Sequence, residues 1–465
     1  MVNVMFTIRL PVTSTDARLT PVGREQGPSQ LDPHVPVHLH AAQLPSLTFS
    51  FREGAGAVRI PPRWILVVSV ATGAAIMGDS LLYAVLPVIW EDLGLTAGMV
   101  GIILSINRFV RMVTNPIAGW VAGRIGARLP FMLAVIVAAG STLAYGIGLG
   151  VAGFLVARCL WGLCWSFLRL GGHLAAIESG VDGRRGFYLG FFSGITRAGS
   201  LIAVVIGGFL TDIISFEVTI YLFTAIGALA GFWTFREWRK QPEFIPPEKD
   251  DDVARHQEPP APQARAWWMA VGTLFSLTFL HGLAISGLVT ATLGYLIADR
   301  YTDGVDLAFV TIGVASFTGL LLGSRFLADA IWAPVAGHSS DRWGRLPFFI
   351  IMATIQVVAL AFLGAFDLLI WTILGALLLF FAATAVQVSM DAVAGDLAIH
   401  GNRATVMSWY ATSHDVGAAI GPIIGYSIGI SIGLATVYPA TAGIFAIVAL
   451  VFVIVQRKVR SIAAR

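Results

Sequence analysis

The most constraining feature of this sequence is a series of twelve long apolar runs, each long enough to cross a lipid bilayer as a helix. A helix rises 1.5 Å per residue, so about 20 apolar residues span the hydrocarbon core. The runs are continuous, whereas the strands of a membrane β-barrel alternate polar and apolar residues. We therefore predict an all-α membrane protein. The runs fall at residues 65–89, 97–121, 129–149, 152–176, 188–211, 217–235, 267–297, 308–336, 346–366, 369–397, 405–430 and 434–455.

The composition excludes a water-soluble protein. Only 12% of the 465 residues are charged, about half the usual share in a soluble domain, and 56% are hydrophobic. This is too little charge to cover the surface of a soluble chain of this length, so a lipid bilayer must surround it. The net charge of +3 arises in short loops and not on one basic face. We therefore expect no nucleic-acid partner.

The loops between the runs differ in charge. Nineteen Lys and Arg residues lie at Arg59 and Arg63 just before the first run, after the last run and in every second loop, whereas the opposite loops hold one base, Arg300. Basic loops are retained in the cytoplasm during membrane insertion. The asymmetry predicts that both termini are cytoplasmic, in the plasma membrane, which in a bacterium is the inner membrane.

Composition also divides the chain into segments. Residues 1–60 are rich in proline and polar residues and lack the apolar core of a signal peptide, which predicts a disordered cytoplasmic tail. The charged, proline-rich residues 236–266 predict a cytoplasmic linker loop between two six-helix halves, 61–235 and 267–456. Residues 457–465 form a basic cytoplasmic tail.

The two halves repeat each other at an offset of 218 residues. The segment from Pro116 to Gly119 corresponds to the segment from Pro334 to Gly337, and Gly199 corresponds to Gly417. In a transporter built from two such halves, the substrate site lies near the midplane where the halves meet, and rocking of one half against the other alternates access to the site.

The loops after the second and eighth runs resemble a signature of the major facilitator superfamily, Gly-x-x-x-Asp-Arg-x-Gly-Arg. The resemblance covers about residues 64–456. It implies twelve transmembrane helices in two homologous six-helix halves, with inverted repeats within each half, and a cytoplasmic gate formed by the motif. Gly123 replaces the motif acid in the first copy, which implies a weaker gate there. The matching residues are Gly119, Arg124, Gly126 and Arg128 in the first half and Gly337, Asp341, Arg342, Gly344 and Arg345 in the second.

Shorter patterns narrow the resemblance to the drug/proton antiporter type. The segment from Gly78 to Pro87 resembles the first-helix motif of those antiporters, with Ala84 where a proline is expected. Arg158 and Gly162 resemble the fourth-helix pattern, in which the family's arginine is linked to proton transfer. The resemblance implies proton-coupled efflux of a small solute.

Ionisable residues inside the runs are the candidates for proton coupling, because such residues are costly in a bilayer and need a partner or a water-filled cavity. Asp79 is the deepest acid of the first half. The family resemblance implies that the first and fourth helices are neighbours that line the cavity, so we predict that Asp79 forms a proton-sensitive pair with Arg158. A purely structural ion pair is the alternative. The proton-coupling candidates are Asp79, Arg158, Asp391 and Asp415.

Polar helix faces predict a substrate cavity. Helical spacing places Arg108, Arg111 and Asn115 on one face of the second helix. It also places Arg158 and Arg169 on one stripe of the fourth helix. Arg325 and Asp329 are four residues apart and are expected to form a local ion pair. Structural helix pairing is the alternative for several of these residues. The cavity candidates are Arg108, Arg111, Asn115, Trp165, Arg169, His173, Arg197, His281 and Gln387.

The charges inside the runs indicate the class of function. Six arginines and four aspartates lie at this depth. The excess of arginine favours an organic anion or a zwitterion as the substrate, beside a drug-like amphiphile. No metal-ligand spacing, cofactor motif or catalytic triad is recognisable, so we expect no metal, no cofactor and no enzyme. The prediction is a monomeric secondary transporter with a small solute and protons as its partners. A non-transporting membrane sensor or assembly protein on the same fold is the alternative.

Overall fold

The computed structural model describes residues 62–179, 185–238, 261–301, 304–307, 310–398 and 403–463. The predicted N-terminal tail and most of the predicted linker lie outside the described residues. Helices continue into both ends of that linker, since one ends at Trp238 and the next begins at Ala261. The basic segment after residue 456 is helical as far as Ala463.

Within the described residues, twelve helical spans are long and apolar enough to cross a membrane, which confirms the predicted architecture. Each of the first six is one uninterrupted helix, although Pro87 lies inside α1, Pro116 inside α2 and Pro130 in the first turn of α3. The six are α1 (Arg63–Ile89), α2 (Ala97–Ile125), α3 (Arg128–Gly146), α4 (Gly150–Ser179), α5 (Arg185–Ile213) and α6 (Phe216–Trp238).

Three spans of the second half contain a π-helical segment, labelled η, between α-helical parts. Such segments are rare and are found mostly at functional sites. The elements are α7 (Ala261–His281), η2 (Gly282–Val289), α8 (Thr290–Arg300), α9 (Val314–Leu327), η3 (Ala328–Trp332), α10 (Ala333–Trp343), α11 (Arg345–Ala365), α12 (Leu369–Ala398), α13 (Arg403–Ile424), η4 (Gly425–Gly429), α14 (Ile430–Ile432) and α15 (Leu434–Ala463).

The predicted bounds of the eighth span, residues 308–336, are wrong. The eighth span runs from Val314 to Trp343 instead, because residues before it form a two-stranded antiparallel hairpin. Strands β1 (Val305–Leu307) and β2 (Val310–Ile312) pair with Val305 opposite Ile312. β-Branched residues in this segment favour the extended conformation, and they resemble membrane residues in a hydropathy pattern. Over the ranges that the structure describes, the regular secondary structure is therefore helical apart from this hairpin.

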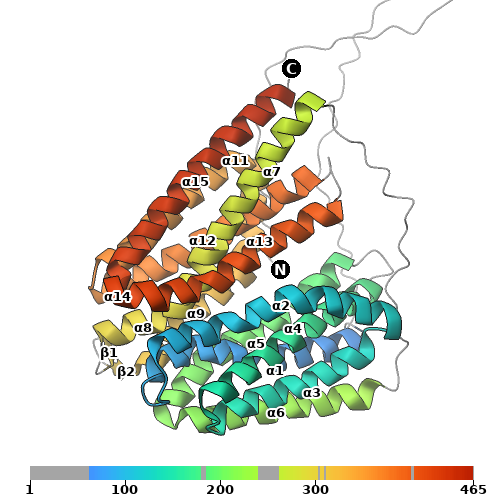
Figure 1. Ribbon diagram of the computed structural model, residues 1–465, viewed down its shortest axis with the longest axis vertical. Coiled ribbons are helices and arrows are strands. Elements are labelled where there is room, and N and C mark those ends of the chain that lie inside the picture. Colours follow the sequence, from blue (N-terminus) through green and yellow to red (C-terminus); the bar gives the residue numbers. More distant parts are fainter. Residues whose placement is uncertain are drawn as a thin grey trace, which may run out of the picture. The chain divides into compact units, whose positions relative to one another are not determined.

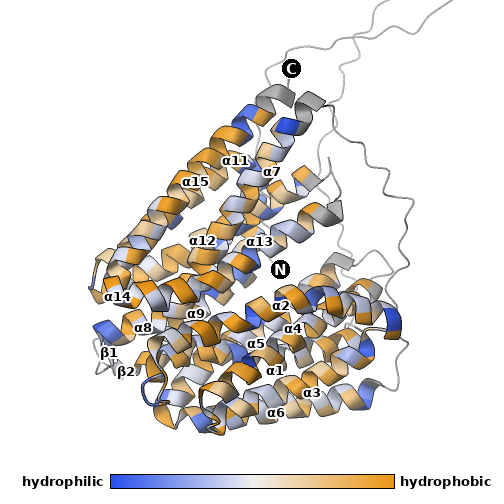
Figure 2. Cartoon of the chain, in the orientation of Figure 1, coloured by the Kyte–Doolittle hydropathy of each residue, from blue (hydrophilic) through white to orange (hydrophobic). Residues whose placement is uncertain are grey.

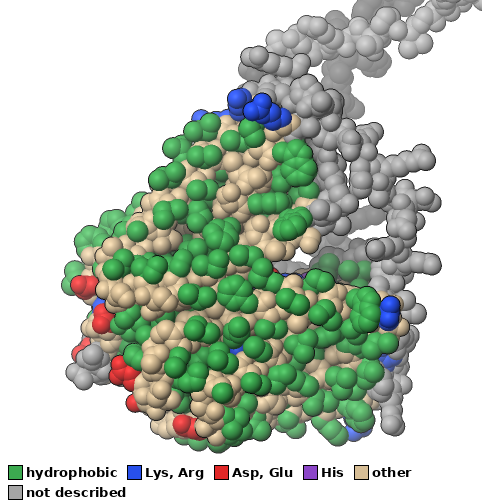
Figure 3. Space-filling model, in the orientation of Figure 1, with side chains coloured by type: hydrophobic (Ala, Val, Ile, Leu, Met, Phe, Trp, Pro, Cys, Tyr) green, Lys and Arg blue, Asp and Glu red, His purple; other side chains and the backbone are tan. Residues whose placement is uncertain are grey.

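The two halves meet through a limited set of helices. In Figure 1, α7 and α15 diverge from the first half as they run away from the β1–β2 hairpin. The helices in contact are α1, α2 and α5 of the first half with α8, α9, α13 and η4 of the second. We call the end with the hairpin and the exposed acids Asp92 and Asp367 the acidic end, and the end with Arg124 and Arg342 the basic end. Figure 3 shows red acidic side chains along one edge and blue basic side chains at the opposite margins.

The outer surface of the helices suits a lipid environment. Large apolar side chains such as Leu229, Phe232 and Ile447 are about two-thirds exposed. Figure 2 shows hydrophobic residues along most of the length of the helices and the strongest hydrophilic colour near their ends. In water such a surface would be an aggregation site, whereas in a bilayer it is the expected one.

Glycines set the closest helix contacts, and the internal repeat preserves them. A Cβ atom on Gly199 of α5 would lie 2.1 Å from the backbone oxygen of Gly73 in α1. A Cβ atom on Gly417 of α13, its counterpart in the repeat, would lie 1.9 Å from the backbone oxygen of Phe279 in α7. Small residues allow helix backbones to approach in a membrane, where packing drives association.

Candidate functional site

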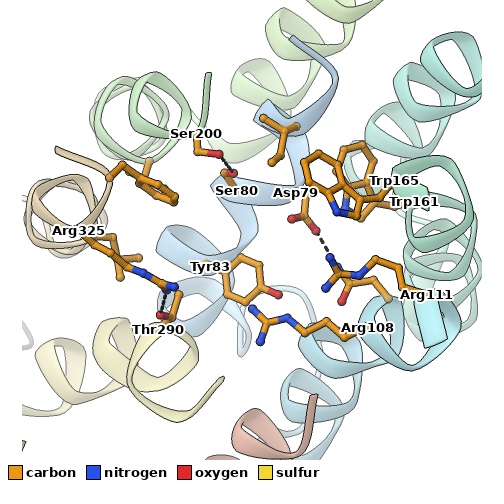
Figure 4. Close-up of a pocket in the computed structure, with 15 residues that line it drawn as sticks. Asp79, Ser80, Tyr83, Arg108, Arg111, Trp161, Trp165, Ser200, Thr290 and Arg325 are labelled. Carbon is orange, nitrogen blue, oxygen red and sulfur yellow. Dashed lines mark hydrogen bonds between the residues drawn. The ribbon is translucent and has the colours of Figure 1, made fainter. Parts of the chain in front are cut away.

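A cavity of about 160 Å³ lies where the two halves meet. Figure 4 shows Asp79 and Tyr83 of α1 in its centre, with Arg108 and Arg111 of α2 on one side and Arg325 of α9 on the other. Trp161 and Trp165 of α4 form an aromatic wall, with ring centroids 5.8 Å apart. Both halves therefore contribute side chains to one site, as expected for a substrate cavity between repeats.

The predicted pair of Asp79 and Arg158 is present. Their side chains form an ion pair, in which the arginine is fully buried and the aspartate is 14% exposed. Arg158 also donates from Nε to the Ile103 carbonyl oxygen at 2.8 Å, and Asn107 donates to Asp79 at 3.1 Å. Asp79 lines the cavity and Arg158 does not. Loss of either partner of a buried pair of this kind leaves a costly buried charge.

Three arginines line the same cavity without such a partner. Arg108 donates to the Ala418 carbonyl oxygen at 2.6 Å, which links α2 to α13 across the halves. Arg325 donates to Thr290 at 2.5 Å and to Ser286 at 2.9 Å, both within the second half. Among the residues that the structure describes, neither arginine lies within ion-pair distance of a carboxylate. The Nε atom of Arg111 is buried and has no hydrogen-bond partner.

A second cavity of about 310 Å³ adjoins the first, since Arg325 lines both. Here the expected local pair of Arg325 and Asp329 is wrong. Asp329 pairs instead with Arg197 of α5, in the other half, and accepts a hydrogen bond from Thr384 at 2.8 Å. Asp329 lies in η3, whose wider turn changes the direction of its side chain relative to a regular helix.

Three predicted residues, His281, Gln387 and Asp391, gather in this second cavity with Arg197. Asp391 accepts hydrogen bonds from Gln387 at 2.8 Å and from Tyr410 at 2.6 Å. His281 is 3% exposed, and its ring centroid lies 6.1 Å from that of His414. The buried Nδ1 atoms of both histidines have no hydrogen-bond partner in the described structure.

Several predicted residues do not line either cavity. Asn115 is half-buried on α2 and lies one turn beyond Arg111. His173 donates a hydrogen bond from Nδ1 to the Arg169 carbonyl oxygen at 2.7 Å and packs edge-on against Phe192. Asp415 is half-buried on α13 and interacts electrostatically with Arg111, Arg169 and Arg108. Arg169 therefore does not line the cavity, but it interacts with the same aspartate, Asp415, as the cavity residues Arg108 and Arg111.

The motif residues at the basic end form different contacts in the two halves. Arg345 pairs with Asp396 of α12, and its Nε lies 4.0 Å from Asp341. In the first half, Arg124 stacks over Trp120 at 4.2 Å, and Arg128 lies over Trp64 at 5.5 Å. At Gly123 a Cβ atom would meet open space. The remaining motif residues, Gly119, Gly126, Gly337, Arg342 and Gly344, lie in the same two helix ends.

Sequence reasoning missed several lining residues, and helical spacing could have identified some of them. Tyr83 is one turn after Asp79, and Arg108 and Arg158 each lie 5.6 Å from its ring. Ser80 bonds to Ser200 at 2.9 Å next to it. Thr290 directly follows η2. Nothing in the sequence indicates that it lines the cavity, because a threonine in an apolar helix commonly forms a hydrogen bond with the backbone of its own helix.

Comparison with known proteins identifies the family. A model of the Major Facilitator Superfamily matches residues 68–323 and 274–463. The chain belongs to the Major Facilitator Superfamily. Because this is a family of membrane transporters, the prediction of a transporter and not an enzyme is confirmed at that level. The resemblance to drug/proton antiporters is also supported, because relatives of this chain are named as drug-resistance proteins.

Two relatives are proteins of drug resistance. The chain is 26% identical over 365 residues to multidrug resistance protein MdtG of Serratia proteamaculans, covering 76% of this chain and 82% of that protein. It is 24% identical over 253 residues to quinolone resistance protein NorA of Staphylococcus aureus, covering 54% of this chain and 61% of that protein.

Solved structures share the fold at low sequence identity. A POT family transporter in complex with 5-aminolevulinic acid has a TM-score of 0.71 at 15% identity, covering 85% of this chain and 96% of that one. A bacterial homologue of the lysosomal transporter Spinster, in an inward-facing and unoccupied conformation, has a TM-score of 0.66 at 14% identity, covering 86% and 97%.

Proposed function

We propose that this protein is a proton-coupled secondary transporter that exports a small organic anion, zwitterion or drug-like amphiphile by alternating access. The observation that carries the proposal is the Asp79 and Arg158 ion pair, held in the wall of a cavity to which both halves contribute. The names of the two relatives, which refer to multidrug and quinolone resistance, support export of an amphiphile.

The proposed orientation places the basic end and both termini in the cytoplasm of the cell, in the plasma membrane, which in a bacterium is the inner membrane. Basic loops favour that side. The halves meet near the acidic end, where Asp212 of α5 bonds to Ser316 of α9, and diverge toward the basic end. In this orientation the described state corresponds to the inward-facing one, and the transporter acts as a monomer.

Coupling follows from competition at Asp79. While the aspartate is ionised, it neutralises Arg158, and Asn107 holds it in place. A proton on Asp79 removes that charge and leaves Arg158 to seek another acceptor. A solute bound in the cavity and a proton on Asp79 therefore change the same charge balance, so each affects the binding of the other. When the solute presents a cationic group to the ionised Asp79, that group and the proton compete for the same carboxylate, so exchange of one for the other drives export.

The test is solute-driven proton flux in proteoliposomes that contain the full chain. A trapped pH dye reports protons, and norfloxacin, a quinolone that is a zwitterion near neutral pH, is the first probe. We expect Asp79→Asn to abolish uphill transport driven by a pH gradient while solute exchange without a gradient persists. Arg158→Gln should impair both, because it leaves the Asp79 charge unpaired. The double variant should recover part of the exchange.

Asp92→Asn is the matched control, because it removes an exposed aspartate at the acidic end that forms no ion pair with the described residues. It should keep uphill transport. Wild-type pH dependence of uphill transport in Asp79→Asn would show that Asp79 is not the coupling site. Absence of solute flux for norfloxacin and for a panel of cations and anions would favour the alternative of a membrane sensor.

A further inference from the structure

The central cavity carries more positive charge than its own carboxylate can neutralise. Arg108, Arg111 and Arg325 line it together with a single acid, Asp79. That acid is already paired with a fourth arginine, Arg158. Asp415 and Asp329 act on these arginines from outside the lining and offset only part of their charge, since Asp329 is itself paired with Arg197. Guanidinium groups that line a poorly hydrated site repel each other, and an added anion reduces this repulsion.

Arg108 and Arg325 are placed to hold such an anion from two sides. They belong to α2 and α9, in different halves, and Figure 4 shows them on opposite sides of Tyr83. A guanidinium has five N–H donors. The described contacts use one donor group of Arg108, toward Ala418, and two of Arg325, toward Thr290 and Ser286. The remaining donors are available for the oxygens of a ligand.

The rest of the cavity suits an aromatic body attached to that anionic group. Trp161 and Trp165 form one wall, and Phe326 of α9 lies in the lining on the other side. A cavity of about 150 Å³ holds one benzene ring, so the 160 Å³ here holds a ring of similar size. The adjoining 310 Å³ cavity, which shares Arg325 with this one, offers further space on the far side of that arginine.

We propose that the transported solute is an aromatic oxyanion, with a carboxylate, sulfonate or phosphonate group bound between Arg108 and Arg325. This inference rests on the proposed transport function and specifies its substrate class. Because the two arginines come from different halves, the bound anion joins the halves electrostatically. The loaded cavity therefore closes more readily than the empty one, in which like charges oppose each other.

The experiment compares three naphthalene probes of equal size. Naphthalene-2-sulfonate is an anion, naphthalene-2-sulfonamide is neutral, and 2-naphthylmethyl-trimethylammonium is a permanent cation. Binding to the full-length protein is measured by calorimetry in detergent, and transport is measured in proteoliposomes. We expect the sulfonate to bind at least about tenfold more tightly than the sulfonamide, because each arginine contact is charge-assisted. We also expect the sulfonate to be transported.

Variants test the two arginines. Arg108→Gln and Arg325→Gln should each weaken sulfonate binding about tenfold while sulfonamide binding stays within twofold. Arg108→Lys and Arg325→Lys keep the charge and should retain an intermediate preference, which guards against loss of folding in the Gln variants. Arg236→Gln, an exposed arginine in the last turn of α6, is the matched control and should keep the preference.

The outcomes separate this inference from the proposed function. Equal binding of sulfonate and sulfonamide, or transport of the cation but not of the sulfonate, overturns the oxyanion class while transport itself stands. Selective sulfonate binding without flux of any of the three probes supports the anion site and contradicts the proposed transport function. A preference that survives in both Gln variants shows that the anion binds elsewhere.

Discussion

Asp212 links the two halves at the acidic end, and its removal should shift the balance between conformations. It lies in α5, yet its Oδ2 atom accepts hydrogen bonds from the backbone N–H of Ser316 at 2.7 Å and from the Ser316 hydroxyl at 2.5 Å. Ser316 is in the first turn of α9, whose N-cap residue, Gly313, has no side chain. The first half thus caps a helix of the second, and the cap exists only while the halves meet there.

The size of the effect follows from ordinary capping energies. An N-cap side chain contributes about 1 kcal/mol, and a negative charge at a helix N-terminus adds about 0.5 kcal/mol. Asp212→Ala should therefore weaken closure at the acidic end by about 1.5 kcal/mol, roughly tenfold in the equilibrium constant. If the open state is about 1% populated, it rises to about 10%. Asp212→Asn keeps an acceptor but loses the charge, so its shift should be about twofold.

The assay is pulsed electron–electron double resonance, which measures the distance between spin labels placed on opposite halves. Asp92 and Asp367 are exposed at the acidic end and accept labels, after the native Cys159 and Cys164 have been replaced by alanine. The longer-distance population should grow from wild type to Asp212→Asn and again to Asp212→Ala.

Glu217→Gln is the control, because Glu217 is an exposed acid at the same end in α6. Its distance distribution should match the wild type. An unchanged distribution in Asp212→Ala, or an equal shift in Glu217→Gln, would refute the capping argument, since the effect would then be absent or due to general surface charge.

Three further predictions concern packing, a cross-half ion pair and orientation. Gly199→Ala should lower the free energy of unfolding by about 2 kcal/mol in thermal unfolding measurements, because the new Cβ atom would lie 2.1 Å from the α1 backbone. Arg197→Asp and Asp329→Arg should each reduce transport, and the charge-swapped double variant should recover part of it, because the two residues pair across the halves. Cysteines at Arg124 and Asp367 should be labelled by an impermeant maleimide from opposite sides of the membrane, with Arg124 cytoplasmic.

Each of these has its own control. Gly190→Ala, in the same helix as Gly199, places a Cβ atom in open space and should not lower stability. No recovery in the double charge swap would show that the ion pair does not contribute to transport. Labelling of the Arg124 position from outside would overturn the orientation.

The sequence alone determined the membrane class, the repeat and the approximate position of every span except the eighth. These are local properties, because hydropathy over about 20 residues identifies a span whatever its neighbours are. The sequence also indicated where function lies. Ionisable residues are so costly in a bilayer that Asp79, Arg108 and Arg158 stand out without any structure. The expected Asp79 and Arg158 pair could be predicted because the family resemblance supplied the adjacency of their helices.

Only the tertiary structure decided which charges meet. Local spacing favoured Arg325 as the partner of Asp329, but the helix approach brought Arg197 to it from 132 residues away. The Asp212 cap on α9 likewise joins residues 104 positions apart, and no periodicity encodes it. Helical spacing fixes the face on which a side chain lies. Which face of another helix lies opposite depends on packing of the whole bundle, set by close contacts such as that of Gly319 with the Val204 backbone.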